Sequence, residues 1–229
     1  MLFAYFMDFG LLIFISPALL LGFWAQGRVR STYARAKQVP VGMTGCAAAM
    51  RILERAGIGH LHIEQVPGRL SDHYDPRHKV LRLSPEVYHG RTAAAVGIAA
   101  HEAGHAIQDA TNYAPLVIRN AAVPAAGIGS NIGLLLAGLG VFFNQYLLLV
   151  GIILFSAVVF FQIVNLPVEF DASARAKAEL AEAGIVNQEE FGYVRSVLSA
   201  AALTYVAATL QAVLTLVYFI WRLQAANRD

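Results

Sequence analysis

Four long apolar stretches dominate the pattern of hydrophobic and polar positions along the chain. Each is close to the length of about 20 residues that an α-helix needs to cross the hydrocarbon core of a bilayer. Asn144-Gln145 is a short polar turn after the second stretch, so the second and third stretches should form an antiparallel hairpin. The pattern therefore predicts four transmembrane helices, at approximately residues 3–25, 122–143, 146–166 and 198–221.

The segment between the first and second stretches is more polar and predicts shorter elements. Residues 44–57 favour a short helix that ends at Gly57. Residues 62–66 and 79–84 alternate in polarity or carry β-branched side chains, and residues 74–78 between them are turn-like. We therefore expect a small antiparallel β-sheet, an edge of which could hold an extended peptide through main-chain hydrogen bonds.

Composition places the chain among integral membrane proteins. Hydrophobic residues make up 57% and charged residues 14%, whereas an ordinary soluble domain has about 25% charged residues. A net charge of +2, without a dense run of lysine or arginine, excludes a nucleic-acid-binding protein. The single cysteine, Cys46, excludes an intrachain disulfide.

The basic residues predict how the chain crosses the membrane. Of the 17 lysines and arginines, none precedes the first stretch and twelve lie between Arg28 and Arg119. Because cytoplasmic segments of membrane proteins are enriched in these residues, we expect this segment on the cytoplasmic side. The third stretch then returns residues 167–197 to the same side.

Residues 101–105, His-Glu-Ala-Gly-His, carry the chemistry of the chain. The preceding run from Thr92 is short-chained, apolar and free of proline, which favours a buried helix. On a helix His101 and His105 project from one face and can bind one Zn²⁺, with Glu102 beside it as the general base of peptide hydrolysis. The alternative is a pair of core histidines with Glu102 paired to an arginine, but a buried ionised glutamate is costly without a cation.

A hydrolytic zinc site usually has three protein ligands and one open position. Glu169 follows the third stretch directly and is our candidate for the third ligand, with Asp171 as its closest competitor. Pro167 predicts the first turn of a new helix there, and a carboxylate near that turn could also serve only to favour the helix amino terminus. Candidates for stabilising a developing oxyanion remain open, and they are Tyr193, Arg195, Tyr205 and His73.

Several longer segments resemble the YugP-like family of bacterial membrane zinc metallopeptidases, over nearly the whole chain. These segments are residues 70–77, 80–88, 99–108, 166–173 and 202–208. The resemblance implies a multi-pass inner-membrane zinc peptidase, with His101 and His105 as ligands and Glu102 as catalytic acid and base. The Glu169 segment is also similar to the third-ligand helix of the HtpX and Ste24 proteases, but Ser173 replaces their supporting aspartate. Support for Glu169 is then absent, weaker, or supplied by Asp171.

These observations predict a mainly α-helical multi-pass membrane protein with a cytoplasmic zincin-like domain containing the small antiparallel sheet. We expect it to bind one zinc ion per chain and to cleave membrane or membrane-proximal proteins, without a nucleic-acid partner. A protease-like scaffold that escorts membrane proteins is the alternative, and a zinc transporter is disfavoured because the apolar stretches hold almost no ionisable residues. The expected organisation is an anchor at 1–26, the metallopeptidase domain at 27–121, a transmembrane hairpin at 122–166, a cytoplasmic helix at 167–197 and a transmembrane helix with a short tail at 198–229.

Overall fold

The computed structural model describes residues 9–226. Residues 1–8 and 227–229, at the ends of the expected anchor and the expected tail, lie outside the described residues. The chain is mainly helical and divides into two compact units. The first comprises the described residues up to Trp24 with Ile118–Leu166 and the chain from Thr204, and the second comprises Ala25–Val117 and Pro167–Leu203.

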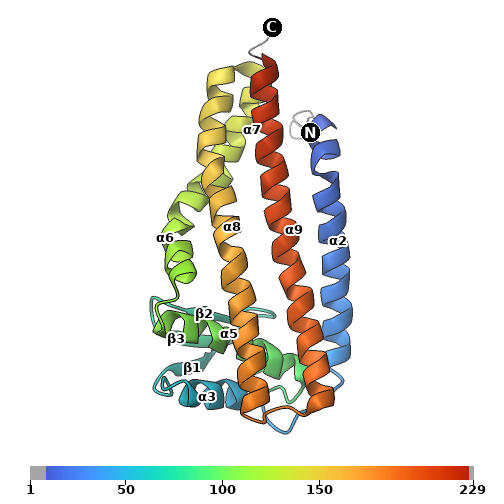
Figure 1. Cartoon of the computed structure of the whole chain (residues 1–229), viewed down its shortest axis with the longest axis vertical. Coiled ribbons are helices and arrows are strands. Elements are labelled where there is room, and N and C mark those ends of the chain that lie inside the picture. The colour runs from blue at the N-terminus through green and yellow to red at the C-terminus, as the bar shows by residue number, and fades with distance from the viewer. Residues whose placement is uncertain (1–8, 227–229) are drawn as a thin grey trace. The chain divides into compact units, whose positions relative to one another are not determined.

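Long helices run through both units (Figure 1). Within residues 9–226, four helical segments are long and apolar enough to cross a membrane, as the sequence predicts. They are α2 (Phe9–Ala36), the segment built from α6 (Ala114–Ile128), the π-helical turn η1 (Gly129–Gly133) and α7 (Leu134–Phe143), then α8 (Gln145–Glu182) and α9 (Gln188–Ala226).

The expectation that a new helix begins near Pro167 is wrong. α8 continues from Gln145 to Glu182 with Pro167 inside it. Proline removes one backbone donor, but the side chains beside it, including Asn165, Val168 and Glu169, are buried, and this packing maintains the helix. The residues that follow the third apolar stretch therefore belong to the same helix as the stretch itself.

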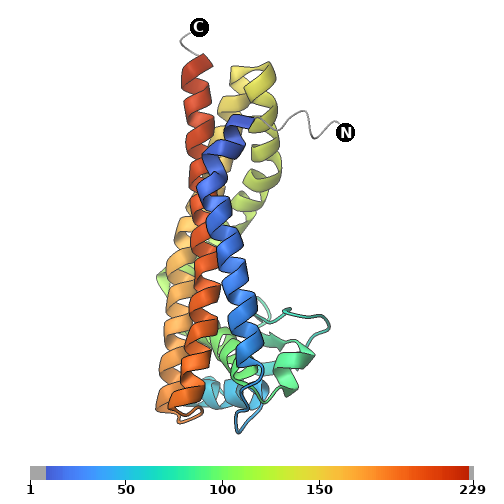
Figure 2. The same cartoon turned by 90° about the vertical axis from the view of Figure 1, so that its right-hand side faces the viewer.

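The first unit is held together by close helix contacts at glycine. A Cβ added at Gly140 would lie 2.2 Å from the backbone nitrogen of Leu148, and one added at Gly133 would lie 2.9 Å from that of Phe155. The predicted hairpin between α7 and α8 is thus packed backbone to backbone, with Asn144 at its turn. On the other side of this unit, Phe14 of α2 and Tyr218 of α9 have ring centroids 5.8 Å apart, and the two helices run side by side (Figure 2).

The second unit contains the small β-sheet that the sequence predicts, in the order β1-β3-β2. The strands are β1 (His62–Gln65), β2 (His73–Asp75) and β3 (Val80–Leu83). β2 pairs antiparallel with β3 because a tight turn joins them, but β1 pairs parallel with β3. The sheet is therefore mixed rather than wholly antiparallel. The segment expected to be only a turn contributes Tyr74 and Asp75 to β2, one of the two edge strands.

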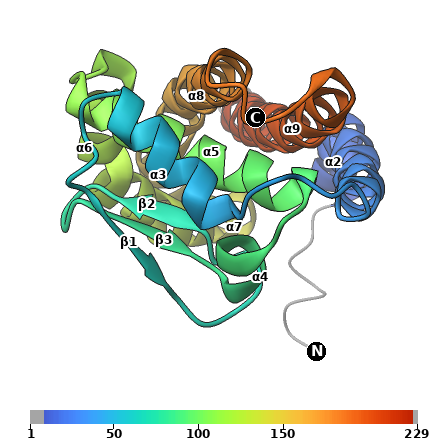
Figure 3. The ribbon, with the colours of Figure 1, turned by 90° about the horizontal axis from the view of Figure 1, so that it is seen from below.

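Helix α5 (Ala93–Ala110) is the centre of the second unit. It contacts α3 (Gly45–Arg55), α4 (Pro85–His89), β2 and β3 (Figure 3). Its alanines and glycines are almost all buried in the core of this unit. Thr92 caps its amino terminus by accepting a hydrogen bond from the Ala95 N–H at 3.2 Å. The small side chains let neighbouring elements approach this helix closely.

Candidate metal centre

The two motif histidines lie on one face of α5, as their spacing predicts. His101 and His105 have ring centroids 4.7 Å apart. His105 is buried and His101 is half-buried. The helix therefore directs two imidazoles to the same point.

Helix α8 brings Glu169 to these histidines. Its Oε2 lies 3.3 Å from His101 Nε2 and 3.8 Å from His105 Nε2. Gly104 makes this approach possible, since a Cβ at this position would lie 2.5 Å from the carbonyl oxygen of Ala172 on α8. Asp171, the competing candidate, is instead paired with Arg175 and accepts from Gln108.

The donor set and its spacing fit a zinc ion. One ligand atom from each of His101, His105 and Glu169 lies within 4.8 Å of the others. With zinc–nitrogen and zinc–oxygen bonds of about 2.0–2.2 Å, the ligand atoms of a tetrahedral site are about 3.3–3.5 Å apart. The separations of Glu169 Oε2 from the two imidazoles, 3.3 and 3.8 Å, are close to that value. Two imidazoles and a carboxylate also leave the fourth position of a tetrahedron open.

Each imidazole is oriented by a contact at its other nitrogen. Ser173 Oγ lies 3.1 Å from His101 Nδ1, and Gln108 Oε1 lies 3.0 Å from His105 Nδ1. Ser173 thus contacts a histidine although it replaces the expected aspartate, and Asp171 acts on Gln108. Gln108 is absent from the residues that the sequence pattern singles out, although a polar amide three residues after His105 in an apolar helix is a usable signal.

Glu102 lies beside the cluster, next to the edge strand β2. Its Oε2 accepts a hydrogen bond from the backbone N–H of Tyr74 at 3.1 Å, so its partner is not the arginine of the alternative interpretation. Burial, together with the charges of Glu169 and Asp72, raises the pKa of Glu102 to about 7, against the lowering effects of His101 and the Tyr74 N–H. A carboxyl group with this pKa can accept and return a proton near neutral pH.

The pKa of His101 is governed by the same neighbours. Burial lowers it, but the hydrogen bond to Glu169 and the charges of Glu102 and Glu169 outweigh burial, so the net shift is upward. Glu102 and Glu169 thus favour a positive charge at His101. A bound cation would satisfy the same preference.

Comparison with known proteins agrees with this geometry. A family model described as "Putative neutral zinc metallopeptidase" matches residues 11–224. The chain belongs to this zinc metallopeptidase family. A protein of Bacillus subtilis (strain 168), described as "Putative membrane protease YugP", is 44% identical over 214 residues, which cover 92% of this chain and 95% of that protein. No solved structure matches the chain.

The resemblance expected from the sequence is therefore confirmed, and the family implies protein substrates. The oxyanion candidates have different surroundings. Arg195 is exposed on α9, Tyr193 packs on the core of the second unit, and Tyr205 belongs to the first unit. His73 lies in β2, directly before the residue whose N–H contacts Glu102. Of the four, His73 is thus the one that the described contacts connect to the metal centre through its chain neighbour.

Proposed function

We propose that this protein is a membrane zinc endopeptidase, with one zinc ion held by His101, His105 and Glu169. The observation that supports it most strongly is the convergence of these three side chains, from two helices, at zinc-ligand spacing. Zinc held there supplies Lewis acidity to a substrate carbonyl and to water.

Glu102 is the proposed general base and acid. Its Oε2 is held by the Tyr74 N–H, which leaves Oε1 to take a proton from the attacking water. After the peptide bond breaks, the same carboxyl group gives that proton to the departing amine. A group whose pKa is about 7 suits both steps, because it is neither a strong acid nor a strong base at neutral pH.

The edge strand β2 is the proposed place for an extended substrate. The run at 79–84 contains β3, which is the central strand of the sheet and cannot accept another strand. β2 pairs with β3 on one side only, and on α5, which β2 contacts, Glu102 accepts from the Tyr74 N–H of this strand. A peptide that adds along β2 would therefore pass close to the proposed base.

Membrane-associated proteins are the proposed substrates. Four described helices can span a bilayer, and the Bacillus subtilis relative is named as a membrane protease. Twelve basic residues between Arg28 and Arg119 favour a cytoplasmic metal centre, in the inner membrane of a bacterium. Tethering the centre to the bilayer raises its local concentration around substrates in the same membrane.

The direct test compares wild type with Glu102→Ala, purified in detergent. We expect about one zinc per chain in both, with cleavage of casein or of a membrane protein by wild type alone. Glu54→Gln, an exposed glutamate on α3, is the control and should retain both zinc and cleavage. Absence of cleavage by wild type over a broad substrate panel, with cellular function retained by Glu102→Ala, would favour the protease-like scaffold.

A further inference from the structure

Gln108 is a buried amide in contact with both helices of the proposed zinc site. It is 0% exposed and lies one turn after His105 on α5. Its Oε1 lies 3.0 Å from His105 Nδ1. Its Nε2 donates to the carbonyl oxygen of Val168 at 2.8 Å and to Asp171 Oδ2 at 2.9 Å.

The partners on α8 determine which end of the amide faces His105. The Val168 carbonyl can only accept, and so can the carboxylate of Asp171, which is held in an ion pair with Arg175. If the amide were reversed, its oxygen would face two other oxygens, and the two hydrogen bonds to α8 would become unfavourable contacts. The NH₂ group must therefore face α8, and the carbonyl oxygen must face His105.

This orientation fixes the tautomer of His105. An amide oxygen only accepts, so the Nδ1 atom that faces it carries the proton. The lone pair of the neutral ring is then on Nε2, the atom that lies 3.8 Å from Glu169 Oε2. A zinc ligand needs its lone pair at that nitrogen.

We propose that Gln108 is a positioning residue that selects the zinc-binding tautomer of His105. The proposal rests on the zinc site proposed above. His101 is different, because the Ser173 hydroxyl at its Nδ1 can donate or accept and is compatible with either tautomer. The tautomer is thus specified at His105, the more deeply buried histidine.

The same amide also anchors α8 beside the third proposed ligand. Val168, whose carbonyl accepts from Gln108, directly precedes Glu169. A purely structural role would depend on this anchor, whereas the positioning role depends on the oxygen that faces His105. Two substitutions separate the roles, because each removes a different part of the amide.

Gln108→Met removes both the oxygen that faces His105 and the NH₂ group that faces α8. Gln108→Glu keeps an acceptor for His105 but places a carboxylate oxygen against the Val168 carbonyl and Asp171. Competition with a chelator, on the full chain in detergent, should give a zinc Kd about 10–100-fold weaker for Gln108→Met. Gln108→Glu should keep a Kd within about threefold of wild type although its melting temperature falls. In zinc-loaded protein, the His105 Nδ1–H resonance should exchange slowly in wild type and Gln108→Glu, and rapidly in Gln108→Met.

Thr111→Val is the matched control. Thr111 lies one turn after Gln108, and its hydroxyl donates only to backbone carbonyls of α5. Its zinc Kd should equal that of wild type. The assignment is overturned if zinc affinity follows thermal stability, with Gln108→Glu the weakest binder, or if Gln108→Met binds zinc as tightly as wild type. In both cases, the proposed zinc peptidase would still stand as long as the wild-type protein binds zinc. A wild-type protein that binds no zinc would overturn both the proposed zinc site and the proposed role of Gln108.

Discussion

Glu169 is the residue on which the proposed site depends most. The two histidines are four residues apart on one helix, so any helix through residues 101–105 brings them together. Glu169 is 64 positions further along the chain than His105, and only the packing of α8 on α5 places it 3.3 Å from His101 Nε2. Its buried carboxylate also supplies the negative charge that two neutral imidazoles lack.

Replacing Glu169 with Gln should therefore lower the zinc content sharply while preserving the fold. The amide has the same shape, but it carries no charge and is a poor zinc ligand. We expect a loss of affinity greater than the roughly 10–100-fold that hydrogen-bond partners of ligands contribute. Metal analysis of the purified variant measures this, with Glu182→Gln, an exposed residue of the same helix, as the control. Full zinc content in Glu169→Gln would rule out this ligand.

Two kinds of sequence pattern predicted the residues of the candidate site. His101, Glu102 and His105 were predicted from their spacing within five positions. Glu169 was predicted from the order of the apolar stretches, which should return the chain to the same face of the membrane. Gln108 could not be found in this way. Its role depends on the acceptors that α8 presents to it, and these are visible only in three dimensions.

At the scale of elements, the site requires α5 and α8 to be unusually close. Gly104 lies where a Cβ would be 2.5 Å from the Ala172 carbonyl oxygen, so the motif glycine is a packing residue. The sequence predicted both helical segments here but not this contact. It also missed the parallel pairing of β1 with β3, because strand periodicity does not encode the direction of the partner strand.

Gly104→Ala should force the two helices apart and weaken zinc binding together with stability. Overpacking of this kind costs about 1–3 kcal/mol of unfolding free energy, and displacement of α8 would move Glu169 away from the histidines. Thermal melting and zinc competition of the same preparation measure both effects.

The control for this experiment is Gly192→Ala on α9, where an added Cβ meets no atom within 4 Å. The unfolding free energy of that variant should rise by roughly 0.5–1 kcal/mol, because alanine favours the helix more than glycine does. Unchanged zinc affinity in Gly104→Ala would contradict the proposed role of the close contact.

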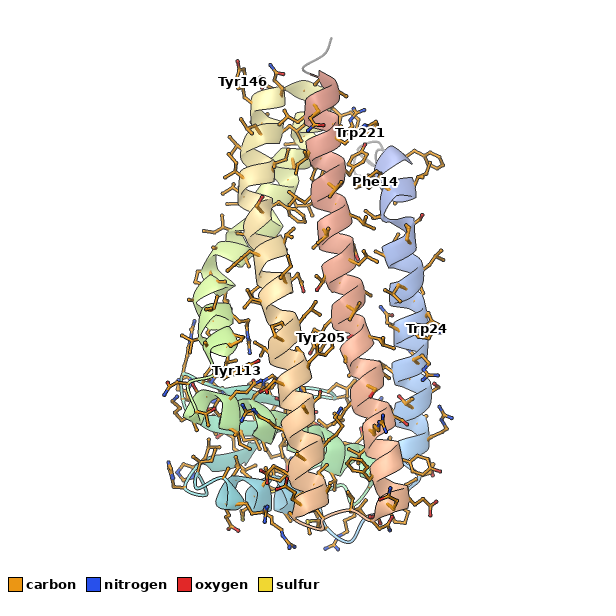
Figure 4. The ribbon with its side chains drawn as sticks, viewed as in Figure 1. Phe14, Trp24, Tyr113, Tyr146, Tyr205 and Trp221 are labelled. Atoms are coloured by element: carbon orange, nitrogen blue, oxygen red, sulfur yellow. The ribbon has the colours of Figure 1, made fainter. Side chains whose placement is uncertain are left out.

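At the scale of the whole molecule, the apolar surface of the first unit supports a membrane location. Large hydrophobic side chains there are exposed, including Leu20 at 69%, Phe143 at 68% and Ile153 at 62%. Tyr146 and Trp221 lie toward one end of α8 and α9, where aromatic residues commonly meet the bilayer interface (Figure 4). Surfaces of this kind are stable in lipid and not in water.

Side-specific labelling should show the proposed orientation in the membrane. In a Cys46→Ala background, Gln145→Cys at the turn between α7 and α8 should react with an impermeant maleimide in intact cells. Ala181→Cys, exposed near the end of α8, should react only after the membrane is permeabilised. The reverse pattern would place the metal centre on the outer side.

We propose that peptide cleavage by this protein requires one zinc ion. Removing zinc from the detergent-purified chain with a chelator, and then adding zinc back in steps, tests this requirement. Cleavage of casein or of a membrane protein should disappear on removal and return in proportion to added zinc, reaching its plateau at about one equivalent per chain. Cleavage that persists after complete removal of zinc would show that the reaction does not need the metal.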